Sequence, residues 1–239
     1  MSENVWEGFR VEEFPFEDQV GTIIYPNITP RGRLVLKGEY RDAFPKFERM
    51  MLERGYYVIN VSHRNRYAPA DCVELTARFV EYVAQKLNAD KRCIMVGMSA
   101  GGTMSAKLAA YHPELAAVLY LDAPGLNLLS LAGLGQREVP PHVWQELVNG
   151  YGFDRITLIN HRDSPIDHLD KLIANNIPII MVYGNADVIA PYCENGKVLE
   201  DYYRAHNGTL KVIEKSMVGH HPHGLDDPTP IVEFVEQFV

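Results

Sequence analysis

The sequence is poor in cysteine and has no long apolar run. Its three cysteines, Cys72, Cys93 and Cys193, are widely separated and show no CxxC spacing, which argues against a disulfide framework or a zinc site. No apolar run approaches the ~20 residues of a membrane span, and the first residues lack a basic segment followed by an apolar stretch. We therefore expect a soluble, cytoplasmic protein with no membrane partner.

Positive charge is also scarce. The chain has 23 basic and 31 acidic residues, a formal net charge of −8, and its basic residues form no stripe that could follow a phosphate backbone. Nucleic acid is therefore not an expected partner. With 46% apolar residues in 239, the chain can bury one core, and we expect a single domain over residues 1–239. The sequence carries no signal for an oligomeric state.

Strands and helices are expected to alternate along most of the chain. Short β-rich runs at 9–16, 20–26 and 33–37 predict a hairpin leading into a sheet. Helices are then expected at 42–54, 71–88, 99–111, 194–205 and 230–239, and strands at 56–61, 91–96, 116–121, 177–183 and 210–215. Asp71 and Glu74 resemble a capping box at the start of the second helix. The alternation predicts a mostly parallel sheet covered on both faces.

Ser99 is the candidate nucleophile. It lies in Gly97-Met98-Ser99-Ala100-Gly101, between an expected strand and an expected helix. A serine hydroxyl must project from the backbone to reach a carbonyl, and a sharp turn between strand and helix, with glycines where the backbone packs closely, presents it in this way. The alternative is a glycine-rich turn that only packs a helix against a strand.

The segment GMSAGG at residues 97–102 resembles the nucleophile elbow of the α/β-hydrolase superfamily. This resemblance implies an α/β-hydrolase fold, with a mostly parallel sheet of about eight strands and helices on both faces. It also implies the chain order serine, acid, histidine. No cofactor is implied.

Asp187 is the acid implied by the resemblance, because it lies in the loop after a late strand. Its carboxylate would hold the catalytic histidine in the correct tautomer. A purely structural role as an Asx turn residue is the alternative. Asp122, at the end of an earlier strand, is the rival acid, since some members of the superfamily place the acid there.

Three histidines follow the last strand in the segment GHHPH at residues 219–223. His220 directly follows a glycine, as the histidine of the superfamily often does, and is the preferred base; His221 and His223 are the alternatives. The cluster could instead hold a transition metal, because neutral imidazoles are good ligands. Without an accompanying carboxylate or cysteine pattern, no metal is expected.

The oxyanion hole needs two backbone N–H groups. Ala100 supplies one by its position after the nucleophile. The second is expected from the loop after the third β-rich run, where Gly38 and Glu39 are both candidates because the His-Gly form frequent in the superfamily is missing.

The stretch at 123–176 is expected to be an insertion over the active-site end of the sheet. Its apolar side chains either line an acyl site or bury the stretch against the core; they are Leu128, Leu129, Leu131, Leu134 and Trp144. Its modest length predicts a preference for short acyl groups.

Further motifs, at residues 164–168, 183–187 and 219–223, look most like bacterial acyl esterases related to the prolyl oligopeptidase group, several of which act on acylated plant carbohydrates. The resemblance implies a serine carboxylesterase that forms an acyl-enzyme on a small-molecule ester. A serine peptidase of the prolyl oligopeptidase type is the alternative, placed second because the propeller typical of such peptidases is not seen. A hydrolase-fold ligand receptor is the other alternative.

Overall fold

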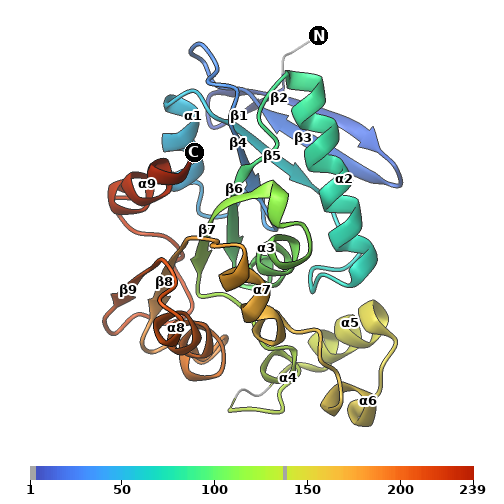
Figure 1. The fold of residues 1–239 in the computed structure, drawn as a ribbon. Helices are drawn as coiled ribbons and strands as arrows, with labels where there is room; N and C mark the ends of the chain where they lie inside the picture. The colour runs from blue at the N-terminus through green and yellow to red at the C-terminus, as the bar shows by residue number, and fades with distance from the viewer. Residues whose placement is uncertain (1–3, 137–138) are drawn as a thin grey trace.

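The described residues form one sheet with helices on both of its faces (Figure 1). The computed structural model of the protein describes residues 4–136 and 139–239. The strands are β1 (Val5–Trp6), β2 (Phe9–Phe16), β3 (Gln19–Ile24), β4 (Leu34–Lys37), β5 (Tyr57–Val61), β6 (Cys93–Met98), β7 (Ala116–Asp122), β8 (Ile179–Gly184) and β9 (Leu210–Lys215). Their order across the sheet is β1-β2-β3-β5-β4-β6-β7-β8-β9. The pairs among β1, β2, β3 and β5 are antiparallel, and every other pair is parallel.

The central strands are apolar because helices cover both faces of the sheet. Every residue of β6 and β7 is buried. One face packs against α2 (Ala70–Leu87), α3 (Ala100–Tyr111), α7 (Leu169–Ala174) and α8 (Gly196–Ala205), and the other against α1 (Lys46–Glu53) and α9 (Thr229–Val235). This arrangement confirms the predicted α/β class, with nine strands in place of about eight.

The start of the first helix and the capping box of the second were predicted wrongly. The first helix was expected from residue 42, but α1 begins at Lys46, because Phe44 has a φ of 49° and a left-handed residue cannot continue a helix. The capping box at Asp71 does not form. Helix α2 begins after Pro69, and the Asp71 carboxylate pairs with the Arg64 guanidinium at 2.5 and 2.7 Å.

The stretch at 123–176 carries α4 (Leu128–Leu131), α5 (Pro141–Tyr151) and α6 (Arg155–Ile159) before α7. Its apolar side chains form a small core together with Tyr67 and Ala100, and this core includes Leu128, Val143 and Leu147. Asn195 ties it to the rest of the chain, since its side-chain oxygen accepts the N–H groups of Leu126 and Asn127. In the part of the chain that the structure describes, no helix combines the length and apolarity that crossing a membrane requires.

Candidate active site

Ser99 sits on a tight turn between β6 and α3. Its backbone has φ 51° and ψ −123°, a left-handed conformation that is strained for a residue with a side chain. The turn packs closely: a Cβ at Gly97 would lie 2.7 Å from the Gly102 Cα, and one at Gly102 would lie 2.5 Å from the Pro124 Cβ. These glycines therefore let the backbone fold tightly enough to project the Ser99 hydroxyl from the turn.

Two side chains from loops far away in the sequence meet Ser99 at this turn. The His220 Nε2 lies 2.9 Å from the Ser99 Oγ, and the His220 Nδ1 lies 2.7 Å from the Asp187 Oδ2. Both His220 and Asp187 are buried. The structure thus brings the preferred serine, histidine and acid of the sequence analysis into one hydrogen-bonded row.

The Asp187 carboxylate is held on both of its oxygens. Its Oδ1 accepts the backbone N–H groups of Ile189 at 2.7 Å and Ala190 at 2.9 Å, while Oδ2 faces His220. Burial raises the pKa of this carboxyl, but the hydrogen bonds from His220 and Ala190 outweigh burial, so the pKa lies below its ordinary value. The Asx turn and the contact with histidine, considered as alternatives from the sequence, coexist here.

Asp122 pairs with a different histidine. Its Oδ1 lies 2.6 Å from the His223 Nδ1, and its Oδ2 accepts the Gly224 N–H at 2.8 Å and the Tyr120 hydroxyl at 3.1 Å. Asp122 is fully buried. The rival acid therefore anchors the loop that carries His220. Nothing in the sequence paired it with His223, which lies 101 residues further along the chain.

His221 differs from its two neighbours because it is exposed. Its ring stacks on Phe44 at 5.5 Å, and among the described residues it has no hydrogen bond to Ser99. Burial, together with the neighbouring His220 and His223, lowers the pKa of His221.

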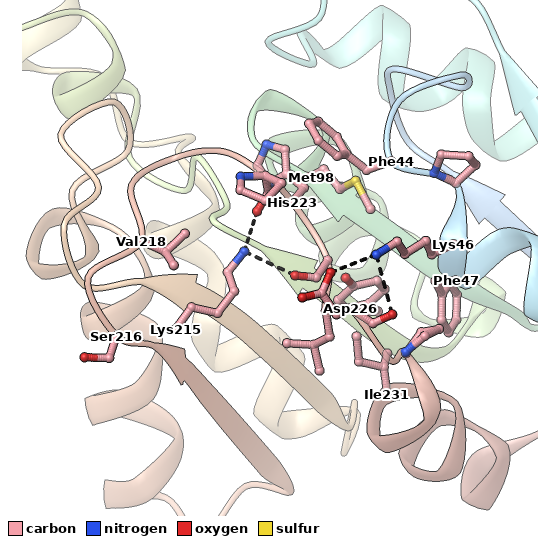
Figure 2. A pocket seen from close by; sticks show the side chains of 16 residues that line it. Phe44, Lys46, Phe47, Met98, Lys215, Ser216, Val218, His223, Asp226 and Ile231 are labelled. Carbon is pink, nitrogen blue, oxygen red and sulfur yellow. Dashed lines mark hydrogen bonds and ion pairs between the residues drawn. The ribbon is translucent and has the colours of Figure 1, made fainter.

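Lys215 braces the histidine loop from β9, as Figure 2 shows. Its ammonium group donates to the carbonyl oxygens of Pro222 at 2.5 Å and Gly224 at 3.2 Å, on either side of His223. A cavity of about 640 Å³ lies beside this loop. Figure 2 shows the side chains that line it. His223 belongs both to that cavity and to the smaller pocket at Ser99, so it lies in the wall between them.

The loop after β4 lies against the nucleophile turn. A Cβ at Gly101 would lie 3.2 Å from the Glu39 nitrogen, and one at Gly38 would lie 2.9 Å from the Gly101 carbonyl oxygen. The Gly38 N–H already donates to the Val96 carbonyl at 2.9 Å. Within residues 4–136 and 139–239, neither the Ala100 nor the Glu39 N–H has a hydrogen-bond partner. Of the two loop candidates, only Glu39 therefore has a free donor.

His63 holds the loop after β4 through a contact with Glu39. Its Nδ1 lies 2.7 Å from the Glu39 Oε1, and its Nε2 lies 2.8 Å from the Thr76 Oγ1. Sequence reasoning did not predict this role, although His63 lies only two residues after the end of β5. A short polar segment after a strand was the only available signal.

The pocket at Ser99 has a volume of about 290 Å³. Its wall outside the histidine loop is formed mainly by aromatic and apolar side chains and one cation, namely Tyr40, Ala43, Phe44, Arg66, Tyr67, Met98, Leu131 and Ile189. Of the five apolar residues proposed for an acyl site, only Leu131 lines this pocket. Leu128 is buried in the core of the insertion, Leu129 and Trp144 pack against that core, and Leu134 is exposed. Arg66, which also lines the pocket, was not among the residues predicted for the site.

Comparison with known proteins assigns most of the chain to one family. A profile of the prolyl oligopeptidase family matches residues 53–234, which include Ser99, Asp187 and His220. Curated protein sequences include no significant match to the chain.

Solved structures share the fold. A bifunctional GH43-CE protein from Bacteroides eggerthii has a TM-score of 0.76 and 17% identity over 96% of this chain and 38% of its own. An acylaminoacyl peptidase from Pyrococcus horikoshii has a TM-score of 0.70 and 14% identity, covering 89% and 37%. An esterase from the planctomycete Thermogutta terrifontis has a TM-score of 0.63 and 17% identity, covering 97% and 91%. The chain spans little more than a third of the first two, and the fold is that of the α/β-hydrolases.

Proposed function

The chain belongs to the prolyl oligopeptidase family of serine hydrolases, and from this premise we propose that it is an esterase for short acyl groups. In this proposal Ser99 is the nucleophile, His220 the general base and Asp187 the acid that orients the base. The observation that carries it is the row of hydrogen bonds from Ser99 through His220 to Asp187. Each group lies within the reach that proton transfer requires.

The reaction proceeds through an acyl-enzyme. The Ser99 Oγ attacks the ester carbonyl carbon while its proton passes to the His220 Nε2, and the carbonyl oxygen becomes an oxyanion. When the carbon–oxygen ester bond breaks, the alcohol leaves with that proton from His220. Water then attacks the acyl carbon, again giving a proton to His220, and the acid is released as the proton returns to Ser99.

The oxyanion is stabilised by two backbone N–H groups in this mechanism. We assign them to Ala100, directly after the nucleophile, and to Glu39, whose loop packs against Gly101. Both donors are unpaired in the described structure and need no rearrangement before the reaction. Preorganised donors of this kind contribute about 3–4 kcal/mol each to the stabilisation of the transition state.

Asp187→Asn is expected to lower kcat by roughly 10⁴-fold, because an amide at this position does not favour the tautomer in which the His220 Nε2 accepts a proton. The amide oxygen of asparagine can still accept the hydrogen bonds from the Ile189 and Ala190 N–H groups, so the variant should still fold. Hydrolysis of p-nitrophenyl acetate and a thermal melt measure both effects. Asp122→Asn is the matched control and should lose far less activity; a reversed order would make Asp122 the catalytic acid.

The acyl group is expected to be short because the pocket of about 290 Å³ lies at the lower limit of small-molecule sites. In a series of p-nitrophenyl esters, kcat/KM should peak at two to four carbons and fall at least tenfold by eight, with no activation at an oil–water interface. Leu131→Ala shortens one side chain that lines the pocket and should move the maximum of kcat/KM to esters with longer acyl chains. A wild-type maximum at eight or more carbons would contradict this proposal.

The alcohol part is expected to be a carbohydrate. Tyr40 and Tyr67 offer aromatic faces beside Ser99, and the Arg66 guanidinium donates to the Tyr40 hydroxyl at 3.2 Å. Glu146 pairs with Arg66 at 2.6 and 2.9 Å, which neutralises the cation and favours uncharged, hydroxyl-bearing partners. Faster release of acetate from acetylated sugars than from ethyl acetate tests this assignment.

A peptidase is the second candidate, because the matched family is that of a peptidase and one structural neighbour is an acylaminoacyl peptidase. Comparing an acyl-peptide p-nitroanilide with p-nitrophenyl acetate separates the two activities. The absence of turnover of both would favour a ligand receptor.

A further inference from the structure

Three imidazole rings converge beside the nucleophile. Nitrogen atoms of His220, His221 and His223 that can bind a metal lie within 4.8 Å of one another. The three ring centroids are 4.8 to 4.9 Å apart. His221 is exposed, so the cluster can be reached from solvent, whereas the other two rings are buried.

Carboxylates orient two of these rings. The Nδ1 of His220 faces Asp187 at 2.7 Å, and the Nδ1 of His223 faces Asp122 at 2.6 Å. Metal-binding histidines commonly have this arrangement, in which a carboxylate holds one ring nitrogen and leaves the other as a ligand. No carboxylate pattern accompanies the three histidines in the sequence, but the fold brings Asp187 and Asp122 against two of them.

The His223 Nε2 is a buried nitrogen without a hydrogen-bond partner among the described residues. The side chain is only 3% exposed, and this nitrogen has no hydrogen bond among the described residues. Buried polar atoms nearly always have a partner, and a buried one without a partner requires an explanation. A bound ion would give it one.

We propose that His220, His221 and His223 form a binding site for one transition-metal ion of the class of Zn²⁺. Neutral imidazoles suit Zn²⁺, Cu²⁺ and Ni²⁺. A tetrahedral Zn²⁺ holds nitrogen ligands at about 2.0–2.1 Å and therefore about 3.4 Å from one another, so the ring nitrogens must approach one another by up to about 1.4 Å. Water would fill the fourth position.

The ion binds the His220 Nε2, which is the nitrogen that faces the Ser99 hydroxyl. Coordination through the His220 Nε2 replaces its hydrogen bond with Ser99, so the serine loses its base. The site is therefore inhibitory, a consequence that rests on the proposed function, whereas binding itself does not.

Calorimetric titration of the EDTA-treated protein with ZnCl₂ tests the site directly. We expect one ion per wild-type chain and at least tenfold weaker binding by His221→Ala, whose exposed side chain can be removed without disturbing the core. His206→Ala, which removes an exposed histidine just after α8, is the matched control and should bind as wild type. No binding by wild type, or equal affinity in His221→Ala, would overturn the proposal.

Hydrolysis of p-nitrophenyl acetate supplies the second readout. Zn²⁺ should inhibit the wild type reversibly, EDTA should restore its rate, and His221→Ala should need at least tenfold more Zn²⁺ for half-inhibition of its own metal-free rate. Zn²⁺ could bind the wild type, bind His221→Ala more weakly, and still not inhibit hydrolysis by the wild type. That result would support the metal site and count against His220 as the base.

Discussion

Ser99→Ala is expected to lower kcat for p-nitrophenyl acetate by ~10⁶-fold, because the members of a coupled triad act as a unit and the nucleophile has no substitute. The variant keeps the backbone conformation of the turn, since alanine carries the same Cβ at the φ of 51° that serine already tolerates. Its melting temperature should therefore remain close to that of wild type.

A fluorophosphonate probe provides an independent measurement. It reacts with an activated serine, so it should label the wild type and leave Ser99→Ala unlabelled. Ser105→Ala is a matched control, because Ser105 also lies on the nucleophile helix but its buried hydroxyl has no partner in the described structure. Retained turnover in a folded Ser99→Ala protein would refute the assignment of the nucleophile.

His220→Ala is expected to lose nearly as much activity as Ser99→Ala. Its imidazole lies 2.9 Å from the Ser99 Oγ, and without it no described side chain is in place to take the proton. His221→Ala and His223→Ala should each retain a measurable fraction, since neither histidine has a hydrogen bond with Ser99 among the described residues.

The three histidine variants are compared by kcat with the same ester, each after a thermal melt. His223→Ala leaves the Asp122 carboxylate buried without its imidazole, so some loss of stability is expected for that variant alone. If His221→Ala were the inactive variant, the assignment of the base would be wrong by one residue.

The fold and the chain order of the candidate site could be predicted because they depend on local patterns. A buried strand, a glycine-flanked serine and a helix follow one another directly at residues 93–111, and the acid and histidine each follow a strand of a parallel sheet. The carboxyl ends of parallel strands share one edge, so these loops meet there.

Features that depend on pairing over long sequence distances could not be predicted. The contact of Asp122 with His223 joins the end of β7 to a loop, and the contact of His63 with Glu39 joins two loops. None of these side chains belongs to a periodic pattern. The start of α1 was predicted wrongly for a different reason. The apolar spacing from residue 44 suits a helix, but Phe44 adopts a positive φ and lines the pocket at Ser99.

The abrupt start of α3 also has an electrostatic consequence. Its twelve residues align their peptide dipoles, and the positive end of the helix lies at Ala100, next to the proposed nucleophile Ser99. The first turn of α3 contains no acidic residue that would offset this field. In the proposed mechanism, the helix as a whole would therefore favour the negatively charged intermediate over the neutral ester, in addition to the hydrogen bond from its first N–H group.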